Sequence, residues 1–235
     1  MRSYNQFCPV AKAAELFCER WTALIIRELM TGSARYSDIQ RGVPLMSPTL
    51  LSKRLKELVA EGVVVRCQDE ARSGWTYQLT EAGSELIPLV MALGVWGQRW
   101  SRRALAEHEK DLGLLLWALE KGASPESLGR GRRIVEFELT DQPQHKRRWW
   151  FLNEAGRCEL CLTPPDRGSD VYVSTTLSDL IQVWRGDIPL KKAISDDRLQ
   201  VHASQRLSRA FQTWLAIAPI ADIAPAADAS AARAG

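Results

Sequence analysis

A basic helical segment carries the side chains in this sequence that are best suited to contact a charged partner. Residues 47–62 read Ser-Pro-Thr-Leu-Leu-Ser-Lys-Arg-Leu-Lys-Glu-Leu-Val-Ala-Glu-Gly. Ser47 is a favourable helix N-cap, the proline after it suits the first helical position, and Gly62 can end the helix in the left-handed conformation. At about 100° per residue, one side of the helix is apolar and carries Leu51, Leu55, Leu58 and Val59. The other side carries Thr49, Ser52, Lys53 and Lys56, with Arg54 beside them.

Hydroxyl and cationic groups on one face of a helix can bind a nucleic acid. Arg and Lys neutralise phosphates and donate hydrogen bonds to base edges, while Ser and Thr hydroxyls donate to phosphate oxygens. The sequence therefore predicts contacts with double-stranded DNA from Ser47, Thr49, Ser52, Lys53, Arg54 and Lys56. Taken without its neighbours, the same segment is also typical of a surface helix with solvated lysines.

The elements before this helix favour the DNA interpretation. Residues 21–30 are apolar enough for a core helix, and Thr31-Gly32-Ser33 ends it. A short helix near residues 36–41 then leads through Gly42-Val43-Pro44 to the Ser47 cap. The order of core helix, short helix, turn and basic helix is that of a helix-turn-helix, whose last helix enters the major groove.

The elements after the basic helix predict a wing. Residues 63–67 are rich in β-branched side chains, residues 68–74 are polar and turn-rich, and residues 75–79 read as a returning strand. Arg72 lies near the tip of this hairpin, where it can reach a phosphate or a minor groove, although a solvated turn residue is an equally good interpretation. A further helix, from Thr80 towards Trp100, has an apolar stripe that needs a partner surface.

The sequence offers little for metal or catalytic chemistry. Cys158 and Cys161 have the spacing of half a zinc site, but positions three apart in a strand point to opposite faces, and there is no second Cys-x-x-Cys pair. The three histidines are far apart and show no ligand spacing. The sequence contains no nucleophile elbow and no phosphate-binding glycine loop. We therefore expect no metal, no cofactor and no enzyme activity.

Composition and charge describe a globular protein with a modest basic surplus. The 235 residues are 46% hydrophobic and 25% charged, with a net charge of +3. Residues 1–103 hold 14 Lys and Arg against 10 Asp and Glu, a surplus of four, so the positive charge lies in the helix-turn-helix part. The polar start is unlike a signal peptide, and no apolar run reaches the roughly 20 residues that cross a bilayer. With five scattered cysteines, these features favour a cytoplasmic protein without a membrane partner.

A second domain follows a helical linker. Gly and Pro break the helical pattern between residues 104 and 130, after which the period changes to two. Successive antiparallel strands are predicted at residues 134–139, 148–152, 157–162 and 170–174, and then helices at 177–184, 190–194 and 204–215 with a last strand at 199–202. The fold class is therefore α+β. It combines a winged helix-turn-helix domain at 1–103, a helical linker at 104–130, an antiparallel sheet covered by helices at 131–216 and an Ala/Pro-rich flexible tail at 217–235.

The first hundred residues resemble the HxlR-type family of bacterial winged-helix regulators. The resemblance covers about residues 4–103, and its motifs are Cys8-Pro9-Val10, Arg20-Trp21-Thr22, Tyr36-Ser37-Asp38-Ile39, Ser47-Pro48, Glu61-Gly62-Val63, Tyr77-Gln78-Leu79-Thr80 and Trp96-Gly97. The family usually has a lysine at the position of Arg20 and a proline in the wing, where this chain has residues 71–74. The resemblance implies a homodimer formed by the N-terminal helix and the helix of residues 86–100, bound to a roughly twofold operator.

The same resemblance draws attention to Cys8. Several relatives sense oxidants or electrophiles through the cysteine at this position, which implies redox sensing as an alternative mode of control. A sensor thiol needs exposure and a lowered pKa, and a small buried residue beside the first helix is the simpler interpretation.

The second domain resembles, less specifically, the sterol-carrier-protein type of lipid-binding domain. The resemblance covers about residues 130–216 and rests on the order of the elements and on a few apolar positions. It implies a hydrophobic cavity between sheet and helices that takes an apolar small molecule. The candidate wall residues are Trp149, Phe151, Tyr172, Leu177, Leu180, Ile181, Trp184, Phe211 and Trp214, for which plain core packing is the alternative.

Three functions follow from these observations. The sequence favours a dimeric transcriptional regulator, which we expect to be a repressor, whose second domain binds an apolar effector and so alters the spacing of two recognition helices. The first alternative is a thiol-based regulator that senses oxidants through Cys8. The second is a lipid carrier or interaction scaffold that does not bind DNA.

Overall fold

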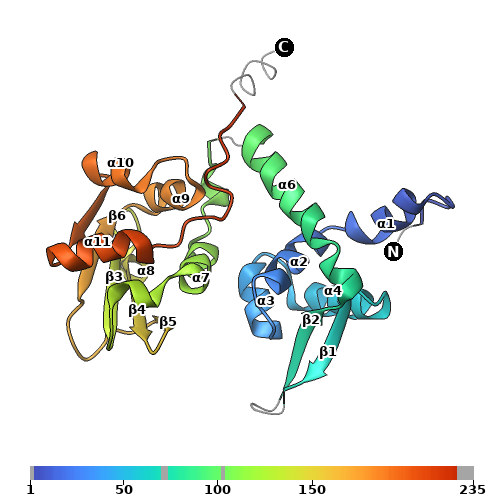
Figure 1. The fold of residues 1–235 in the computed structure, drawn as a ribbon, viewed down its shortest axis with the longest axis horizontal. Coiled ribbons are helices and arrows are strands. Elements are labelled where there is room, and N and C mark those ends of the chain that lie inside the picture. The colour runs from blue at the N-terminus through green and yellow to red at the C-terminus, as the bar shows by residue number, and fades with distance from the viewer. Residues whose placement is uncertain (1–2, 70–73, 102–103, 227–235) are drawn as a thin grey trace. The chain divides into compact units, whose positions relative to one another are not determined.

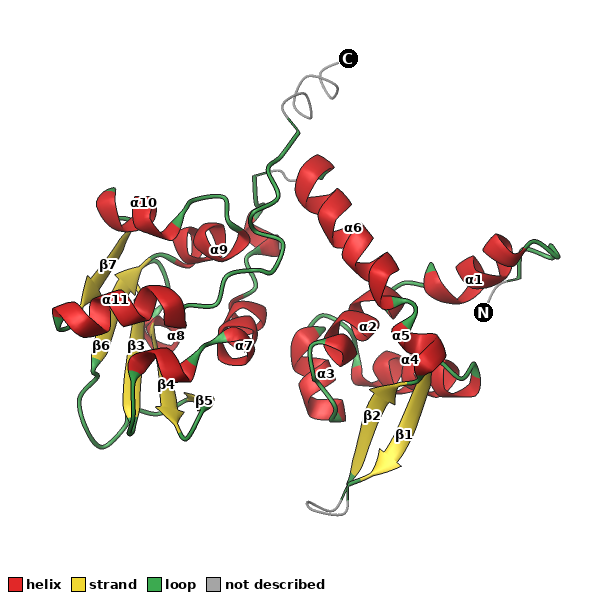
Figure 2. Ribbon diagram, in the orientation of Figure 1, coloured by secondary structure: helices red, strands yellow, loops and turns green. Residues whose placement is uncertain are grey.

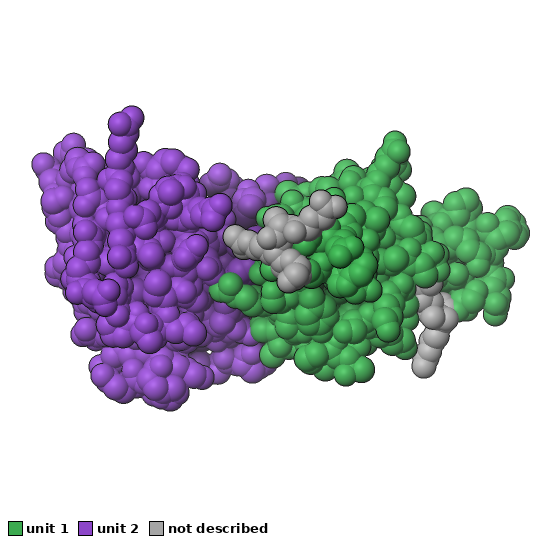
Figure 3. All heavy atoms as spheres, turned by 90° about the horizontal axis from the view of Figure 1, so that it is seen from below, with its two compact units in different colours: residues 1–97 green, residues 98–235 purple. Residues whose placement is uncertain are grey.

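The computed structural model describes residues 3–69, 74–101 and 104–226. The chain divides into two compact units, residues 1–97 and residues 98–235, which Figure 3 shows in different colours. Each unit has its own hydrophobic core. No helix among the described residues is both long and apolar enough to cross a membrane.

The first unit is a winged helix-turn-helix domain (Figure 1). It contains α1 (Pro9–Phe17), α2 (Thr22–Met30), α3 (Tyr36–Gly42), α4 (Pro48–Ala60), β1 (Val64–Gln68), β2 (Trp75–Leu79), α5 (Glu81–Ser84) and most of α6 (Ile87–Trp100). The strands β1 and β2 pair antiparallel, with Val64 opposite Leu79 and Gln68 opposite Trp75. The predicted order of core helix, short helix, basic helix and hairpin is therefore confirmed.

The core of the first unit is built from the apolar faces of α2, α3 and α4 with the start of the wing. Its buried members include Ile25, Ile39, Leu51, Leu55 and Val64. Val59 was predicted to lie on the packed face of α4, but 38% of it is exposed. The prediction was wrong because the buried stripe runs through Leu51, Leu55 and Leu58, and Val59 lies at the edge of that stripe.

The helix predicted from residue 80 to Trp100 is divided into α5 and α6. The hydroxyl of Thr80 caps α5 by accepting a hydrogen bond from the Gly83 N–H at 3.1 Å. Pro88, in the first turn of α6, has no N–H to continue the hydrogen bonds of α5, so one helix ends and another begins here.

The second unit packs helices on one face of a sheet (Figure 2). Its strands are β3 (Arg133–Leu139), β4 (Arg148–Glu154), β5 (Arg157–Cys161), β6 (Val171–Thr175) and β7 (Leu199–His202). Its helices are η1 (Glu107–Glu109), α7 (Leu112–Gly122), η2 (Pro125–Leu128), α8 (Gln144–Arg147), α9 (Leu177–Arg185), α10 (Leu190–Ser195) and α11 (Gln205–Trp214). The α+β fold class is confirmed.

The sheet differs from the prediction in one pairing. Its strand order is β5-β4-β3-β6-β7, and β3 and β6 run parallel whereas the other neighbours are antiparallel. The chain returns after β5 to the start of β3, where the Asp170 carboxylate accepts hydrogen bonds from the Ile134 N–H and from Arg133, both at 2.9 Å. The sequence pattern predicted where each strand lies, but it contains no signal for this order.

The part of the C-terminal segment that packs on the second unit extends beyond the predicted end of the domain at residue 216. Ala216 is buried, and the Ala218 N–H donates a 2.8 Å hydrogen bond to the carbonyl of Trp184. Ala221 packs against Gly186, whose missing side chain leaves the room for this contact. Residues 217–226 therefore belong to the folded unit, because small alanines allow close backbone approach, and residues 227–235 lie outside the described part.

Candidate nucleic-acid interface

Local hydrogen bonds hold the start of α4. The Ser47 hydroxyl accepts a hydrogen bond from the Leu50 N–H at 3.3 Å, as predicted for an N-cap. The Tyr36 hydroxyl of α3 donates to the carbonyl of Pro48 at 2.8 Å, and the Ser52 hydroxyl lies 3.5 Å from the same tyrosine. Gly62 has a φ of +69°, which ends the helix in the predicted left-handed conformation.

The turn between α3 and α4 is held from two sides. Gln40 donates hydrogen bonds through its side-chain amide to the carbonyls of Met46 at 2.8 Å and Val43 at 3.4 Å. Arg27 of α2 donates to the carbonyl of Gly42 at 2.7 Å. Backbone groups that would otherwise lack partners are thus satisfied, so the turn has a defined shape and sets the direction of α4.

Five of the six predicted contacts on α4 share an exposed surface. Each of the following side chains belongs to an exposed residue: Ser47, Thr49, Ser52, Lys53 and Lys56. Neither Lys53 nor Lys56 forms an ion pair with another described residue. The opposite face is buried through Leu51, Leu55 and Leu58. The helix therefore presents two cations and two hydroxyl groups to solvent from one side, and Ser47 lies at its N-terminal end.

Arg54 does not belong to this surface, and its predicted DNA contact is corrected here. Only 8% of its side chain is exposed. Its guanidinium lies 2.8 Å from a carboxylate oxygen of Glu19, in the turn before α2, and 2.7 Å from one of Glu57. The Arg54 Nε has no hydrogen-bond partner among the described residues but is buried, so the guanidinium presents no exposed edge to a phosphate.

The wing adds a second cationic feature, which the sequence reasoning missed. The Arg66 guanidinium of β1 lies 4.0 Å from the centre of the Trp75 ring of β2, and half of that tryptophan is exposed. Their cross-strand positions could have predicted this contact, since Trp75 is opposite Gln68, two residues from Arg66. Arg35 pairs with Asp69, where the chain leaves β1 for the turn of the hairpin. Arg72, the predicted wing contact, lies outside the described residues.

An exposed apolar stripe runs along α6. Leu89, Leu93, Trp96 and Trp100 recur at spacings of four, three and four, and between 44% and 59% of each is exposed. Helix α1 lies entirely in the described part and has no buried residue. Its apolar Val10 is exposed. Apolar stripes with this spacing usually face another helix.

The cysteines are all free thiols. Cys8 is half-buried and is the N-cap residue of α1, while Cys18 is exposed at the other end of the same helix. Burial, helped by the nearby Glu120 carboxylate, raises the pKa of Cys158 to about 12, so this thiol is poorly suited to metal binding. Within the described residues, no three His, Cys, Asp or Glu side chains form a metal-binding group.

The candidate ligand residues of the second unit fill its core. Eight of the nine pack in the cluster between sheet and helices, and Phe137, Phe151, Phe211 and Trp214 make ring contacts with centres 5.7 to 6.2 Å apart. The Trp214 indole N–H donates to the Asn153 side chain at 2.6 Å. The ninth residue, Tyr172, lies on the opposite face of the sheet and donates to Glu138, because it pairs with Glu136 on that face.

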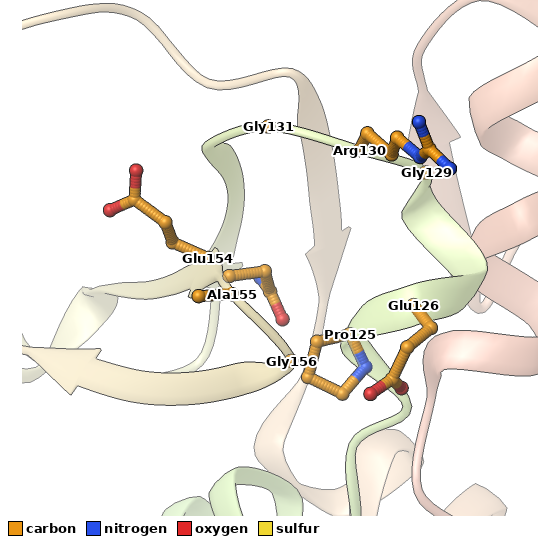
Figure 4. Close-up of a pocket in the computed structure, with 9 residues that line it drawn as sticks. Pro125, Glu126, Gly129, Arg130, Gly131, Glu154, Ala155 and Gly156 are labelled. Atoms are coloured by element: carbon orange, nitrogen blue, oxygen red, sulfur yellow. The ribbon is translucent and has the colours of Figure 1, made fainter.

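Two pockets of the second unit lie elsewhere. One, of about 400 Å³, is lined by the loop of Pro125 to Gly131 and the hairpin of Asn153 to Gly156 (Figure 4). The other, of about 380 Å³, is lined mainly by polar residues, among them Lys110, Ser178 and Arg185. Of the nine predicted wall residues, none lines either pocket in the described part of the chain.

Comparisons with known proteins agree with this geometry. The model of the HxlR-like helix-turn-helix family matches residues 16–105, and that of the SCP-2 sterol transfer family matches residues 115–216. The chain is 39% identical to the HTH-type transcriptional regulator YvaP of Bacillus subtilis, over 41% of this chain and 91% of YvaP. It is 39% identical to Rv3095 of Mycobacterium tuberculosis, over 40% of this chain and 60% of that regulator, which is less than two thirds of its length.

A third relative has a solved structure. The chain is 34% identical to the HTH-type transcriptional regulator YodB of Bacillus subtilis, over 41% of this chain and 88% of YodB. The reduced form of YodB aligns with 40% of this chain and 93% of that chain, with a TM-score of 0.36. The chain thus belongs to the HxlR-like helix-turn-helix family of transcriptional regulators, and its second unit matches the SCP-2 sterol transfer family.

Proposed function

We propose that this protein is a homodimeric regulator whose α4 enters the major groove of a DNA operator and represses transcription there. The observation that carries the proposal is the division of α4 into a buried leucine face and an exposed face with Lys53 and Lys56. Cations without carboxylate partners attract phosphates, while Thr49 and Ser52 supply hydrogen-bond donors close by. Arg66 on the wing adds a cation beside the helix-turn-helix.

The proposed homodimer pairs the apolar stripe of α6 and the exposed face of α1 with those of a second copy. Burying four large apolar residues in each protomer removes surface that water would otherwise cover. A twofold dimer places two copies of α4 on the same side of the DNA, and the operator then has two related half-sites about one helical turn apart.

The test compares two double variants of the full chain that lose the same charge. Lys53→Ala with Lys56→Ala removes the exposed lysines of α4, and Lys146→Ala with Lys191→Ala removes two exposed lysines of the second unit. The probe is a duplex enriched from a random library by the unaltered protein. If each α4 lysine contacts a phosphate, the dimer of the lysine variant loses four contacts. The negative slope of log affinity against log salt then becomes shallower by about 3.6.

The double variant of the second unit distinguishes the loss of phosphate contacts by α4 from a general effect of removing positive charge. We expect it to keep the slope of the unaltered protein. Equal slopes for the two double variants would contradict the assignment of α4. Salt-independent binding, or none, in the unaltered protein would favour the lipid-carrier or scaffold alternative.

For the second unit we propose an apolar small-molecule effector that changes the spacing of the two α4 helices. The match to a sterol transfer family supports this proposal. Because the residues predicted to form the cavity are packed against one another, the ligand must separate α11, with Phe211 and Trp214, from the sheet. Native mass spectrometry of the purified full chain tests the idea: we expect a dimer with retained extra mass, and a dimer of the bare polypeptide mass would contradict it.

A second candidate function is redox sensing through Cys8. Its half-buried position at the N-cap of α1 favours this candidate, since a change there reaches the helix proposed to form the dimer. Diamide should then release DNA from the unaltered protein and from Cys18→Ser but not from Cys8→Ser. An unchanged response of Cys8→Ser would exclude this thiol as the sensor.

A further inference from the structure

A buried arginine joins the proposed recognition helix to another part of the first unit. Arg54 comes from the middle of α4, next to the exposed Lys53, yet 8% of its side chain is exposed. Its pair with Glu57 lies within the same helix, three residues along. Its pair with Glu19, at 2.8 Å, reaches a residue 35 positions earlier, in the turn between α1 and α2. The Glu19 pair is therefore the one that connects two elements.

The turn that carries Glu19 has a constrained shape. Trp21 starts α2 with a φ of +80°, a left-handed conformation that a bulky residue adopts when its surroundings impose it. The Arg20 guanidinium lies 5.0 Å from the centre of the Trp21 ring. Glu19 is thus held on a turn of fixed geometry, and through it Arg54 fixes the position of α4.

The geometry assigns Arg54 the role of a positioning residue: it does not touch DNA, and through Glu19 it keeps α4 in register with the α1–α2 turn. The inference rests on the proposed DNA-binding function. Reading a sequence requires side chains within hydrogen-bonding distance of base edges, whereas attraction to phosphates tolerates small displacements. Loss of the Glu19–Arg54 pair should therefore reduce specificity more than it reduces general affinity for DNA.

Glu19→Gln gives the sharpest test because two explanations predict opposite results. Simple electrostatics predicts that removing a negative charge strengthens binding to any DNA. A positioning role predicts weaker binding to a duplex enriched by the unaltered protein, with little change for a shuffled duplex of the same composition. The matched control is Glu61→Gln, which removes an exposed carboxylate at the end of α4 that has no ion pair with the described residues.

The measurement is the ratio of affinities for the enriched and shuffled duplexes, by fluorescence anisotropy of the full chain at one salt concentration. We expect this ratio to fall about three- to tenfold for Glu19→Gln and for Arg54→Met, at a temperature where circular dichroism shows both variants folded. The double variant should lose no more than Arg54→Met alone, because both substitutions remove the Glu19–Arg54 pair. Glu61→Gln should leave the ratio unchanged.

Three results would overturn the inference. In the first, Glu19→Gln behaves like Glu61→Gln. In the second, Arg54→Met weakens binding to both duplexes equally and reduces the magnitude of the salt slope by about 1.8, as the loss of one phosphate contact in each protomer would. In the third, the unaltered protein shows no salt-dependent binding to either duplex, which refutes the proposed function together with this inference. If Arg54→Met fails to fold, Glu19→Gln alone decides between the remaining outcomes.

Discussion

Replacing Gly42 by alanine should disturb the turn that directs α4. A Cβ atom at this position would lie 2.0 Å from Cδ and 2.1 Å from Oε2 of Glu28, far inside normal contact distance. The Glu28 side chain is 6% exposed, and its carboxylate accepts hydrogen bonds from the Ser33 hydroxyl at 3.2 Å and the Arg27 Nε at 3.0 Å. The carboxylate must therefore move and weaken both bonds.

The cost of this change follows from the crowded contact. Overpacking costs about 1–3 kcal/mol, and a weakened hydrogen bond to a charged group adds about 1–2 kcal/mol, because Arg27 is partly solvated. The helix propensity of alanine returns at most about 1 kcal/mol. We expect a net loss of about 2–4 kcal/mol in the free energy of unfolding of the first unit.

Hydrogen–deuterium exchange of the full chain measures this loss. Amides of residues 22–60 that exchange through unfolding should exchange about 30- to 1000-fold faster in Gly42→Ala, while those of the second unit serve as the internal reference. Glu28→Ala removes the obstructing group, so adding Gly42→Ala to it should cost less than about 0.5 kcal/mol more. Additive losses in the double variant, or unchanged exchange in Gly42→Ala, would show that the contact with Glu28 does not limit residue 42 to glycine.

Three further predictions concern other parts of the molecule. Leu93→Glu should raise the dimer dissociation constant, measured by sedimentation, by about 1000-fold, because the two leucines buried in a dimer contribute about 4 kcal/mol. Leu162→Glu in the second unit should leave this constant unchanged. Equal dissociation constants for the two variants would contradict the α6 interface. Iodoacetamide at pH 8.5 should modify the exposed Cys18 and not Cys158, because the raised pKa of about 12 keeps the Cys158 thiol protonated, and rapid labelling of Cys158 in the folded protein would contradict this. The contribution of the protonated Cys158 thiol to the free energy of unfolding is fully present below its ordinary pKa of 9.0 and is lost as the pH rises towards 12. Ser47→Ala should cost about 1 kcal/mol by removing the N-cap of α4, and amides at the start of α4 that exchange at the unaltered rate would argue against that cap.

Local patterns in the sequence were sufficient to predict α4. The Ser47 cap, Pro48, the leucine stripe and Gly62 all act within the helix, so the spacing of residue types predicts its ends and its buried leucines, although not the exposure of Val59. Arg54 was placed wrongly beside the polar face. On a wheel of about 100° per residue it lies about 40° from Leu58 and about 100° from Lys53, at the edge of the leucine face. Its pairing depends on tertiary packing, because its partner Glu19 is distant in sequence.

The second unit shows the same limit. Alternating residues predicted each strand, because the period of two reflects a half-buried strand. They did not predict the parallel pairing of β3 with β6, which depends on how the chain returns to Ile134 through Asp170. Apolar residues also predict burial without distinguishing a filled core from a cavity. Phe211 and Trp214 are therefore buried as expected, but they line neither of the two pockets described above.

Reading of a DNA sequence by a dimer of this protein can be tested by selecting duplexes from a random library with the full chain and sequencing them. We expect enrichment of a motif with two inverted half-sites about one helical turn apart. Pools that show no motif beyond the starting library after several rounds would contradict it.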